Sequence, residues 1–424
     1  MLQSIVPCTG MGHPRGPKAC VTLAIMDPSL EQARQAFVAG NEQFERHDYE
    51  AAAGFFEQAL RHAPGRPSVL MNLGVSCVQL GRFERADECL RQALAADANQ
   101  CNAWVAWGIT QMALGNWPQA LNCHEQARAL GAGGAQFCLR WGQCLEHEGR
   151  LPQALQAFDQ ALAHAPDLAE AWSQRAHVHR AMGQTTQAIE GYQRALQLGA
   201  DPELHRYYLA ALSPEQPMVN APAAYVETLF DQYADDFESH LVGQLGYQGH
   251  SVLLQHLPVD PAARFGQVWD LGCGTGLCGP LIRPRSEHLS GVDLSSAMVV
   301  KAQSLGVYDS LHAQDLVSFL QQATTKSDLV LAADVFIYVG WLDAVFEALS
   351  PCVKPGGWLA FTVEEADPGF EVQLHSSLRY AHALPYLQKL AAEHGWRWAK
   401  LHRAPLRLDQ AQPLMGAYVY LQKT

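Results

Sequence analysis

The segment Gln267–Gly276 reads QVWDLGCGTG and decides the fold of the second half of this 424-residue chain. Its apolar start predicts a buried strand that ends at Asp270, and three glycines then predict a tight turn into a helix. Glycine lets a backbone approach a ligand closely, and the N-terminus of a helix is electropositive. The segment therefore predicts a strand–turn–helix unit that binds a ligand.

Further strands follow this unit, and each leads to a polar residue. Ser290–Asp293 places a carboxylate 17 residues after Gly276, where it can accept hydrogen bonds from both hydroxyls of a ribose. The next strand leads to Asp315, an acid placed to meet the amino group of an adenine. Strands that alternate with helices are typical of a doubly wound parallel sheet. Two more segments complete the pattern: 328–334, followed by Tyr338, and Lys354–Gly357, followed by a strand at Trp358–Val363.

A second interpretation fits some of the same residues. Gly274–Gly279 satisfies the GxGxxG pattern of nicotinamide-binding proteins, and Asp293 lies at about the right distance from it. A pyrophosphate, however, disfavours an acid beside it, and Asp270 ends the strand just before the loop. A sulfonium cation and an amine tolerate that acid. Trp396–His402 and Met415–Leu421 also predict an antiparallel hairpin at the end of the chain.

The motifs DLGCGTG, GVD, AQD, DLVLAADVFIYVG and KPGG resemble, in order and spacing, those of class I S-adenosylmethionine-dependent methyltransferases over residues 225–424. The resemblance implies a Rossmann-like α/β domain and S-adenosyl-L-methionine as the cofactor, without a metal. It implies that the glycine turn surrounds the methionine part, that Asp293 holds the ribose, and that Asp315 reads the adenine. Tyr233 fits a helix that covers the cofactor, although it also fits a core aromatic position. The cofactor-binding residues expected from this resemblance are Tyr233, Asp270, Gly272, Cys273, Gly274, Gly276, Asp293, Leu294, Asp315, Leu316 and Asp334.

Candidates for catalysis follow the fourth and fifth strands, where the resemblance places the acceptor. Histidine is the natural base at neutral pH. The D/N-P-P-Y/F tetrad associated with amide and exocyclic amine methylation is absent, and Asp334-Val-Phe-Ile stands in its place. Each candidate also fits a structural role, and Asp334 also fits a helix cap. The predicted catalytic residues are Asp334, Tyr338, His375 and His382, with Arg379 and Tyr380 nearby.

The first half of the chain repeats every 34 residues, in blocks 33–66, 67–100, 101–134, 135–168 and 169–202. Three columns of the alignment hold only small residues, which mark points where two helices cross closely. The period and the small/large pattern resemble the tetratricopeptide repeat. We expect a disordered tail at 1–28, a repeat array with a capping helix at 29–212, a proline-rich linker at 213–224 and the methyltransferase domain at 225–424. The whole chain resembles the bacterial methyltransferases that carry an N-terminal tetratricopeptide array.

Arrays of this kind resemble peptide-binding grooves lined by the first helix of each block, so we expect a protein or peptide partner. The alternative is that the apolar residues among them pack against the next repeat. Asn41 with Arg34 resembles part of a clamp for a partner's C-terminal carboxylate, but the lysines of such a clamp are missing. The expected groove residues are Phe37, Asn41, Met71, Val75, Val105, Ile109, Met112, Gln143, His177 and Arg180.

Composition excludes several other classes of protein. The formal net charge is −13 without any Lys/Arg run, which argues against nucleic acid as a partner. The eleven cysteines form no CxxC pair, so buried free thiols are favoured over disulfides or zinc. The start of the chain is not a secretory signal, and Met26 is an alternative start. No apolar stretch is long enough to span a membrane, so we expect a cytoplasmic protein.

Three functions fit these observations. The first is a methyltransferase that acts on a protein recruited through the repeats. The second is a methyltransferase for a small molecule or lipid intermediate, with the repeats used for assembly. The third is a scaffold that binds the cofactor but no longer catalyses; the intact cofactor motifs weigh against it.

Overall fold

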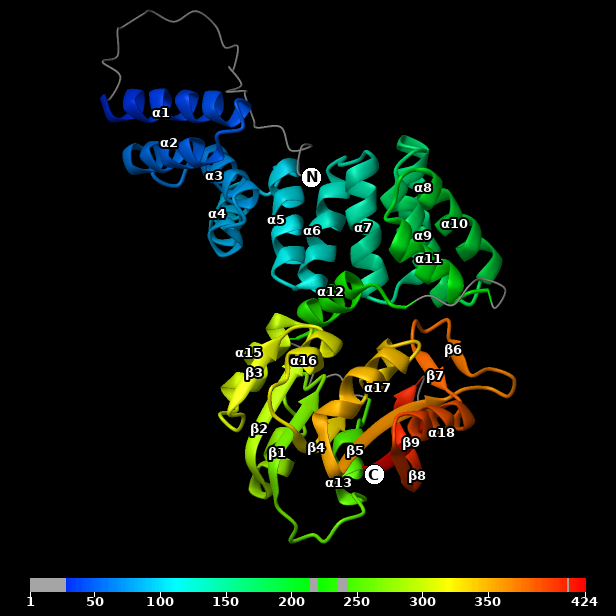
Figure 1. Cartoon of the computed structure of the whole chain (residues 1–424). Helices are drawn as coiled ribbons and strands as arrows, with labels where there is room; N and C mark the ends of the chain where they lie inside the picture. The colour runs from blue at the N-terminus through cyan, green and yellow to red at the C-terminus, as the bar shows by residue number, and fades with distance from the viewer. Residues whose placement is uncertain (1–27, 214–219, 235–242, 244, 410–411) are drawn as a thin grey trace, which may run out of the picture. The chain divides into compact units, whose positions relative to one another are not determined.

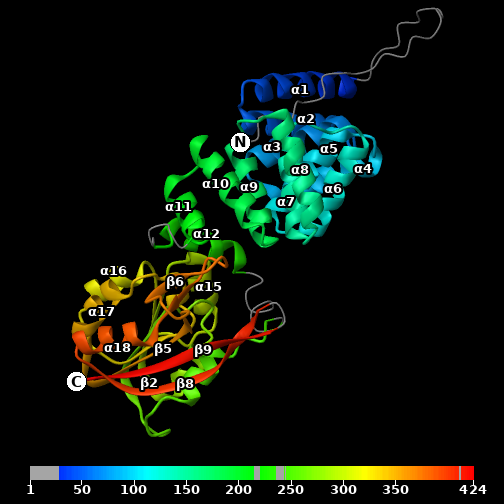
Figure 2. The same ribbon diagram turned by 90° about the vertical axis from the view of Figure 1, so that its right-hand side faces the viewer.

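The computed structural model describes residues 28–213, 220–234, 243, 245–409 and 412–424. The chain divides into two compact units, Met1–Ala200 and Asp201–Thr424. Figures 1 and 2 show that the first unit is helical and that the second is built around a sheet. Among the described helices, none combines the length and apolarity needed to cross a membrane.

Successive pairs of helices form the first unit, two in each 34-residue block. The small residues of the repeat mark the contacts between the helices of a pair. A Cβ added to Gly74 would lie 2.6 Å from Cγ of Leu90, and one added to Gly142 would lie 2.5 Å from Cε1 of Phe158. Each glycine therefore makes room for a large side chain on the second helix of its own block. The helices are α1 Pro28–Glu45, α2 Tyr49–His62, α3 Pro67–Gln79, α4 Phe83–Ala96, α5 Cys101–Ala113, α6 Trp117–Ala129, α7 Ala135–His147, α8 Leu151–His164, α9 Ala169–Ala181 and α10 Thr185–Gln197.

The turn inside each block needs a left-handed residue. Gly81, Gly115 and Gly149 have φ angles of 70°, 73° and 69° there, which glycine adopts without steric cost. The first block uses His47 at this position, with φ 62°. The turn conformation is therefore kept even where the glycine is replaced.

Four of the expected groove residues belong to the core of the array. Phe37, Met71, Val75 and Ile109 are buried among the helices, so the packing alternative holds for them and they do not line an open groove. Six of the expected residues remain half-buried: Asn41, Val105, Met112, Gln143, His177 and Arg180.

The second unit begins with α11, Pro202–Ala210, which the sequence pattern assigns to the repeat array as its cap. The Tyr207 hydroxyl donates a 2.6 Å hydrogen bond to the carbonyl of Leu378, deep within the α/β unit. The Tyr207 ring also packs beside Tyr225 and Tyr380. α11 therefore packs within the unit that contains the sheet.

The sheet of this unit has the order β3-β2-β1-β4-β5-β7-β6, with β9 on β5 and β8 on β9. Strands β1 to β5 are parallel, whereas β8 and β9 form the antiparallel hairpin expected from the sequence. Figure 2 shows the long β8–β9 ribbon beside β5. The strands are β1 Phe265–Leu271, β2 Ser286–Asp293, β3 Ser310–Ala313, β4 Ser327–Ala332, β5 Val353–Glu365, β6 Val372–Leu374, β7 Tyr380–His382, β8 Trp396–Asp409 and β9 Gln412–Lys423.

Helices cover this sheet and connect its parallel strands. The fold class expected from the sequence, a helical repeat solenoid followed by a Rossmann-like α/β domain, is confirmed. The carboxyl ends of β1, β2 and β4 meet at one edge, which is where such sheets bind ligands. The helices are α12 Ala223–Tyr233, α13 Gly249–Gln255, α14 Gly279–Ile282, α15 Ser296–Ser304, α16 Leu316–Gln322, α17 Asp343–Leu349 and α18 Leu384–Glu393, with short 3-10 turns η2 Arg283–Arg285, η3 Phe336–Tyr338 and η4 Ser350–Cys352.

Candidate functional site

The glycine turn after β1 is tightly packed. Gly272, Gly274 and Gly276 have φ angles of 61°, 53° and 95°, which other residues rarely adopt. A Cβ on Gly272 would lie 2.5 Å from Cγ2 of Val335. The sequence places three glycines here because both the backbone angles and the space exclude a side chain.

The helix expected directly after this turn differs from the prediction. α14 begins only at Gly279 and lasts four residues. A single turn carries little of the macrodipole invoked from the sequence, so the electropositive helix end is a minor contributor here. The polar groups at this edge are instead the backbone of the turn and the carboxylates beside it.

Asp293, at the end of β2, is held at the glycine turn. Its carboxylate accepts a 2.8 Å hydrogen bond from the amide of Gly274 and a 2.9 Å bond from the amide of Ser295. Burial raises the pKa of Asp293, and these amide hydrogen bonds act in the opposite direction. The carboxylate is thus fixed in orientation at the cavity wall.

Asp270, at the end of β1, is buried beneath the turn. Burial raises its pKa to about 7, while the hydroxyl of Tyr308 donates a 2.7 Å hydrogen bond that favours the charged form. Tyr308 was not singled out from the sequence, because it lies in the loop before β3 without a motif. A cation or an amine nearby would stabilise the ionised form of such a buried carboxyl group.

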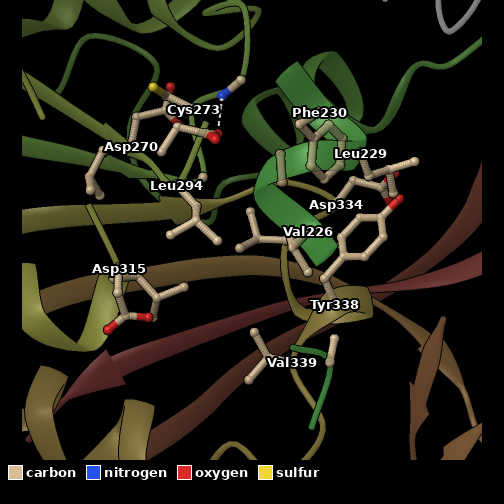
Figure 3. Close-up of a pocket in the computed structure, with 18 of the residues that line it drawn as sticks. Val226, Leu229, Phe230, Asp270, Cys273, Leu294, Asp315, Asp334, Tyr338 and Val339 are labelled. Atoms are coloured by element: carbon tan, nitrogen blue, oxygen red, sulfur yellow. Dashed lines mark hydrogen bonds between the residues drawn. The ribbon is translucent and has the colours of Figure 1, made fainter. Parts of the chain in front are cut away.

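A cavity of about 540 Å³ opens at this edge of the sheet. Its wall includes Asp270, Gly272, Cys273, Gly274, Asp293, Leu294, Asp315, Leu316 and Asp334 of the expected cofactor-binding residues. Figure 3 shows Asp270, Cys273, Leu294 and Asp315 around this space. The size is within the range typical of small-molecule sites. Gly276 shapes the turn but is not part of the wall, and the side chain of Tyr233 lies outside the described part of the structure.

At the far end of the expected cofactor site, Asp315 has a second role. Its carboxylate accepts a 2.9 Å hydrogen bond from the amide of Ser318 and caps α16. Leu294 and Leu316 flank it on the wall and offer apolar contact. This end suits a flat, apolar ring with a polar edge.

Helix α12 covers the cavity. Val226, Leu229 and Phe230 line it, and the Phe230 ring meets Tyr338 edge-on with centroids 5.1 Å apart (Figure 3). Asp231 on the same helix accepts hydrogen bonds from the hydroxyl of Ser295, at 2.5 Å, and from the amide of Ala297, at 3.3 Å. The helix is therefore fastened to the start of α15, directly after the Asp293 loop.

Asp334, after β4, is neutralised by a buried arginine. Nη1 of Arg407 on β8 donates to both carboxylate oxygens, at 3.0 and 2.9 Å, and Nη2 donates to Glu364. Burial lowers the pKa of Arg407, but the two carboxylates raise it above its usual range, so the guanidinium stays charged. Asp334 also has φ 62°, and its amide bonds to Thr362. The expected helix cap is not formed, and both carboxylate oxygens are occupied by the guanidinium of Arg407.

The comparisons with known proteins agree with this geometry. The model of a family described as "Methyltransferase domain" matches residues 269–359. Tetratricopeptide-repeat models match 43–107, 105–169 and 145–212. The chain is a tetratricopeptide-repeat protein fused to a class I methyltransferase domain.

Curated relatives of the methyltransferase domain are O-methyltransferases. Malonyl-[acyl-carrier protein] O-methyltransferase of Enterobacter lignolyticus (strain SCF1) is 29% identical over 145 residues, 34% of this chain and 54% of that protein. Ubiquinone biosynthesis O-methyltransferase of Paraburkholderia phytofirmans (strain DSM 17436 / LMG 22146 / PsJN) is 32% identical over 105 residues, 22% of this chain and 43% of that protein. The chain spans about half the length of the curated relatives it matches.

Solved structures with a partial likeness to this chain include the following two proteins. The MamA protein is 18% identical, with 40% of this chain and 92% of that chain covered and a TM-score of 0.37. YrrB, titled a TPR protein with an unusual peptide-binding site, is 21% identical, with 41% and 90% covered and a TM-score of 0.38.

The predicted catalytic residues of the methyltransferase domain are not all brought together. Tyr338 and Arg379 line the cavity, whereas His375 and His382 are not among the described residues of its wall. His382 is fully buried, donates from Nε2 to the carbonyl of Gly340 at 2.8 Å, and burial lowers its pKa to about 4. This position does not support His382 as a base at the cavity. Tyr380 is likewise fully buried outside the wall.

Besides Tyr308, which is not part of the cavity wall, the sequence analysis missed Arg407, Tyr247 and His250, which line it. Arg407 lies on β8, 73 positions from its partner Asp334. Tyr247 and His250 lie at the start of α13, with stacked rings 5.4 Å apart, and burial lowers the pKa of His250. Burial thus favours the neutral imidazole, and Nδ1 of His250 has no hydrogen-bond partner among the described residues. Its only sequence signal was a histidine near the start of the domain, which a single sequence does not distinguish from a surface residue. Within the described ranges, no group of three or more His, Cys, Asp or Glu is arranged to hold a metal ion.

Proposed function

We propose that this protein transfers the methyl group of S-adenosylmethionine to an acceptor on a protein that the repeats recruit. The observation that carries the cofactor assignment is Asp293, a half-buried carboxylate fixed beside the glycine turn on the wall of a 540 Å³ cavity. Such a carboxylate suits the two hydroxyls of a ribose. Asp315 and its leucine neighbours suit the adenine, and buried Asp270 suits the amine of the methionine part.

Positioning supplies much of the rate of a methyl transfer, which is an in-line displacement. The bound cofactor supplies an electrophilic methyl group on a sulfonium. The chain excludes water by laying Val226, Leu229 and Phe230 of α12 over the cavity. Where the acceptor carries a proton, a ring nitrogen of His250 can take it, and the hydroxyl of Tyr338 can orient the acceptor. Asp334, which pairs with Arg407, is better suited to fix that arginine in the cavity wall.

The relatives support a second candidate, methylation of a small oxygen acceptor. Both named relatives are O-methyltransferases, one for malonyl-[acyl-carrier protein] and one in ubiquinone biosynthesis. The largely apolar cavity wall also suits a compact acceptor. In this case the repeats serve assembly rather than substrate capture.

Calorimetry with S-adenosylhomocysteine tests the cofactor assignment directly. We expect saturable binding to the full chain; absence of heat with folded protein would sink the proposal. A nicotinamide dinucleotide serves as the competing ligand, and tighter binding of that compound would favour the second interpretation of the glycine motif.

Labelling separates the acceptors. The full chain is incubated with radiolabelled S-adenosylmethionine and either a proteome or its small-molecule extract. A discrete labelled protein favours the first candidate, and label in extractable small molecules alone favours the second. A chain of residues 201–424, which keeps α11, should lose labelling of a recruited protein while it retains cofactor affinity.

A further inference from the structure

The charged side chains of the cavity wall that the structure describes have hydrogen-bond or ion-pair partners, with one exception. Asp293 and Asp315 are held by backbone amides, and Asp270 is held by Tyr308. Arg407 is saturated by Asp334 and Glu364. Among the described residues, no acidic side chain pairs with Arg379, although it is half-buried and lines the cavity. A partly desolvated guanidinium without an anion is costly unless a ligand supplies one.

The turn that carries Arg379 is held rigid on both sides. Leu378 adopts a left-handed φ of 65°, and its amide bonds to the carbonyl of His375 at 2.8 Å. Its carbonyl accepts the 2.6 Å hydrogen bond from Tyr207 of α11. Leu378 and Tyr380 are buried, 4% and 0% exposed, so Arg379 between them is fixed at the wall. This preorganisation is what a binding arginine requires.

Topology places Arg379 at the acceptor end of the cavity. It precedes β7, which lies beyond β4 and β5 from the glycine turn of β1. Gly340 lies against both Asn220 and Tyr380, so the Arg379 turn adjoins the segment that follows Tyr338. Apolar side chains of Val339 and Trp341 also line the wall here, with Asn220 as a polar neighbour.

We propose that Arg379 binds the carboxylate of an acceptor whose remaining part is apolar. This inference rests on the proposed methyl transfer at the same cavity. A guanidinium pairs with a carboxylate through two parallel hydrogen bonds. One unpaired cation on a wall that also carries four aspartates matches a single negative charge better than a doubly charged phosphate. Tyr207 acts through the turn and is a positioning residue.

The test uses the full chain saturated with S-adenosylhomocysteine and two matched pairs of probes, phenylacetate with phenylacetamide and octanoate with octanamide. Calorimetry should show that each acid binds at least about 10-fold tighter than its amide, as for a charge-assisted bidentate pair. Arg379→Gln should abolish this preference and leave the affinity for S-adenosylhomocysteine within about 2-fold. Arg397→Gln removes a surface arginine of β8 and should change nothing.

Tyr207→Phe keeps the ring and removes only the hydrogen bond to the turn. We expect it to weaken the binding of the acids by about 3- to 10-fold, which is the contribution of one hydrogen bond. The amides and S-adenosylhomocysteine should bind as before. A general loss of packing would weaken all ligands together and would not support positioning.

Three results would overturn the proposal: acids and amides that bind equally, no acid binding to the wild-type chain, or a loss of S-adenosylhomocysteine affinity in Arg379→Gln. The last result would assign the arginine to the cofactor's own carboxylate. Failure of the wild-type chain to bind S-adenosylhomocysteine at all is a separate outcome, which removes the proposed function itself.

Discussion

Close contacts in the repeat array join residues that are near one another in the sequence, whereas those in the methyltransferase domain join residues that are far apart. In the array, Gly74 meets Leu90 and Gly142 meets Phe158, each 16 positions later in the chain. In the methyltransferase domain, Arg407 pairs with Asp334 across 73 positions, and Tyr207 bonds to Leu378 across 171. The array is thus stabilised by neighbouring helices, as solenoids are, whereas the cavity depends on contacts that only the folded sheet creates.

This contrast predicts that a single substitution in the domain should cost more than one in the array. The largest effect is expected for Arg407→Met, because it leaves Asp334 and Glu364 buried without their partner. Removing one member of a buried ion pair costs about 3–5 kcal/mol. Urea unfolding of the domain measures this loss. Arg403→Met is the matched control on the same strand, since Arg403 pairs with Glu365 at the surface, where solvent screens the pair, and should change stability little. Equal losses in the two variants would contradict the contrast.

The next effect is expected in binding. Asp293→Ala removes a carboxylate that orients the Gly274 turn and that we assign to the ribose. Loss of two charge-assisted hydrogen bonds should weaken the binding of S-adenosylhomocysteine by about 100-fold. Asp309→Asn, just before β3 at the amino end of that strand and outside the cavity wall, should bind as the wild type does. Unchanged affinity in Asp293→Ala would refute the assigned role.

In the array, His124 offers a test that depends on pH. It is fully buried against Gly108, neither ring nitrogen has a partner among the described residues, and burial lowers its pKa to about 3. Below pH 6.5, His124 is protonated in the unfolded chain but stays neutral in the folded array. The free energy of unfolding is therefore unaffected above this pH and falls as the pH drops towards 3. The loss should reach about 2 kcal/mol at pH 5.

His124→Phe should remove this loss, because Phe158 already fills the equivalent position of the next block. Urea titrations at pH 7 and pH 5 compare the two proteins. An identical pH dependence in both would show that His124 is not the titrating group.

The smallest effect is expected for Gly142→Ala, whose new methyl group would press on Phe158. We expect a loss of about 1–2 kcal/mol in the array and no change in S-adenosylhomocysteine affinity. Gly54→Ala is the control: Gly54 lies within α2 with open space around it, so alanine should stabilise the helix by about 0.5–1 kcal/mol. A weaker cofactor affinity in Gly142→Ala would break the separation between the two regions.

Much of the cofactor end of the candidate site could be predicted from the sequence. The glycine turn, Asp270 and Asp293 lie on one short segment and on the strand after it, and parallel strands bring their carboxyl ends together by rule. Asp334 was also found, but its partner Arg407 was not, because pairing across β8 depends on the register of the terminal hairpin. The sequence predicts His382 as a base from its motif alone. The structure shows that this side chain is buried and is not part of the cavity wall.

The sequence by itself determined the 34-residue repeat, the alternation of strands and helices, and the carboxylates beside the glycine turn, since each depends on local backbone geometry or on contacts between neighbours. Tertiary structure alone decided which charges are neutralised and that the Tyr207 hydroxyl reaches the Leu378 carbonyl beside Arg379. These features depend on residues far apart in the chain, and whether an arginine is paired or free is a property of the folded surroundings rather than of the residue.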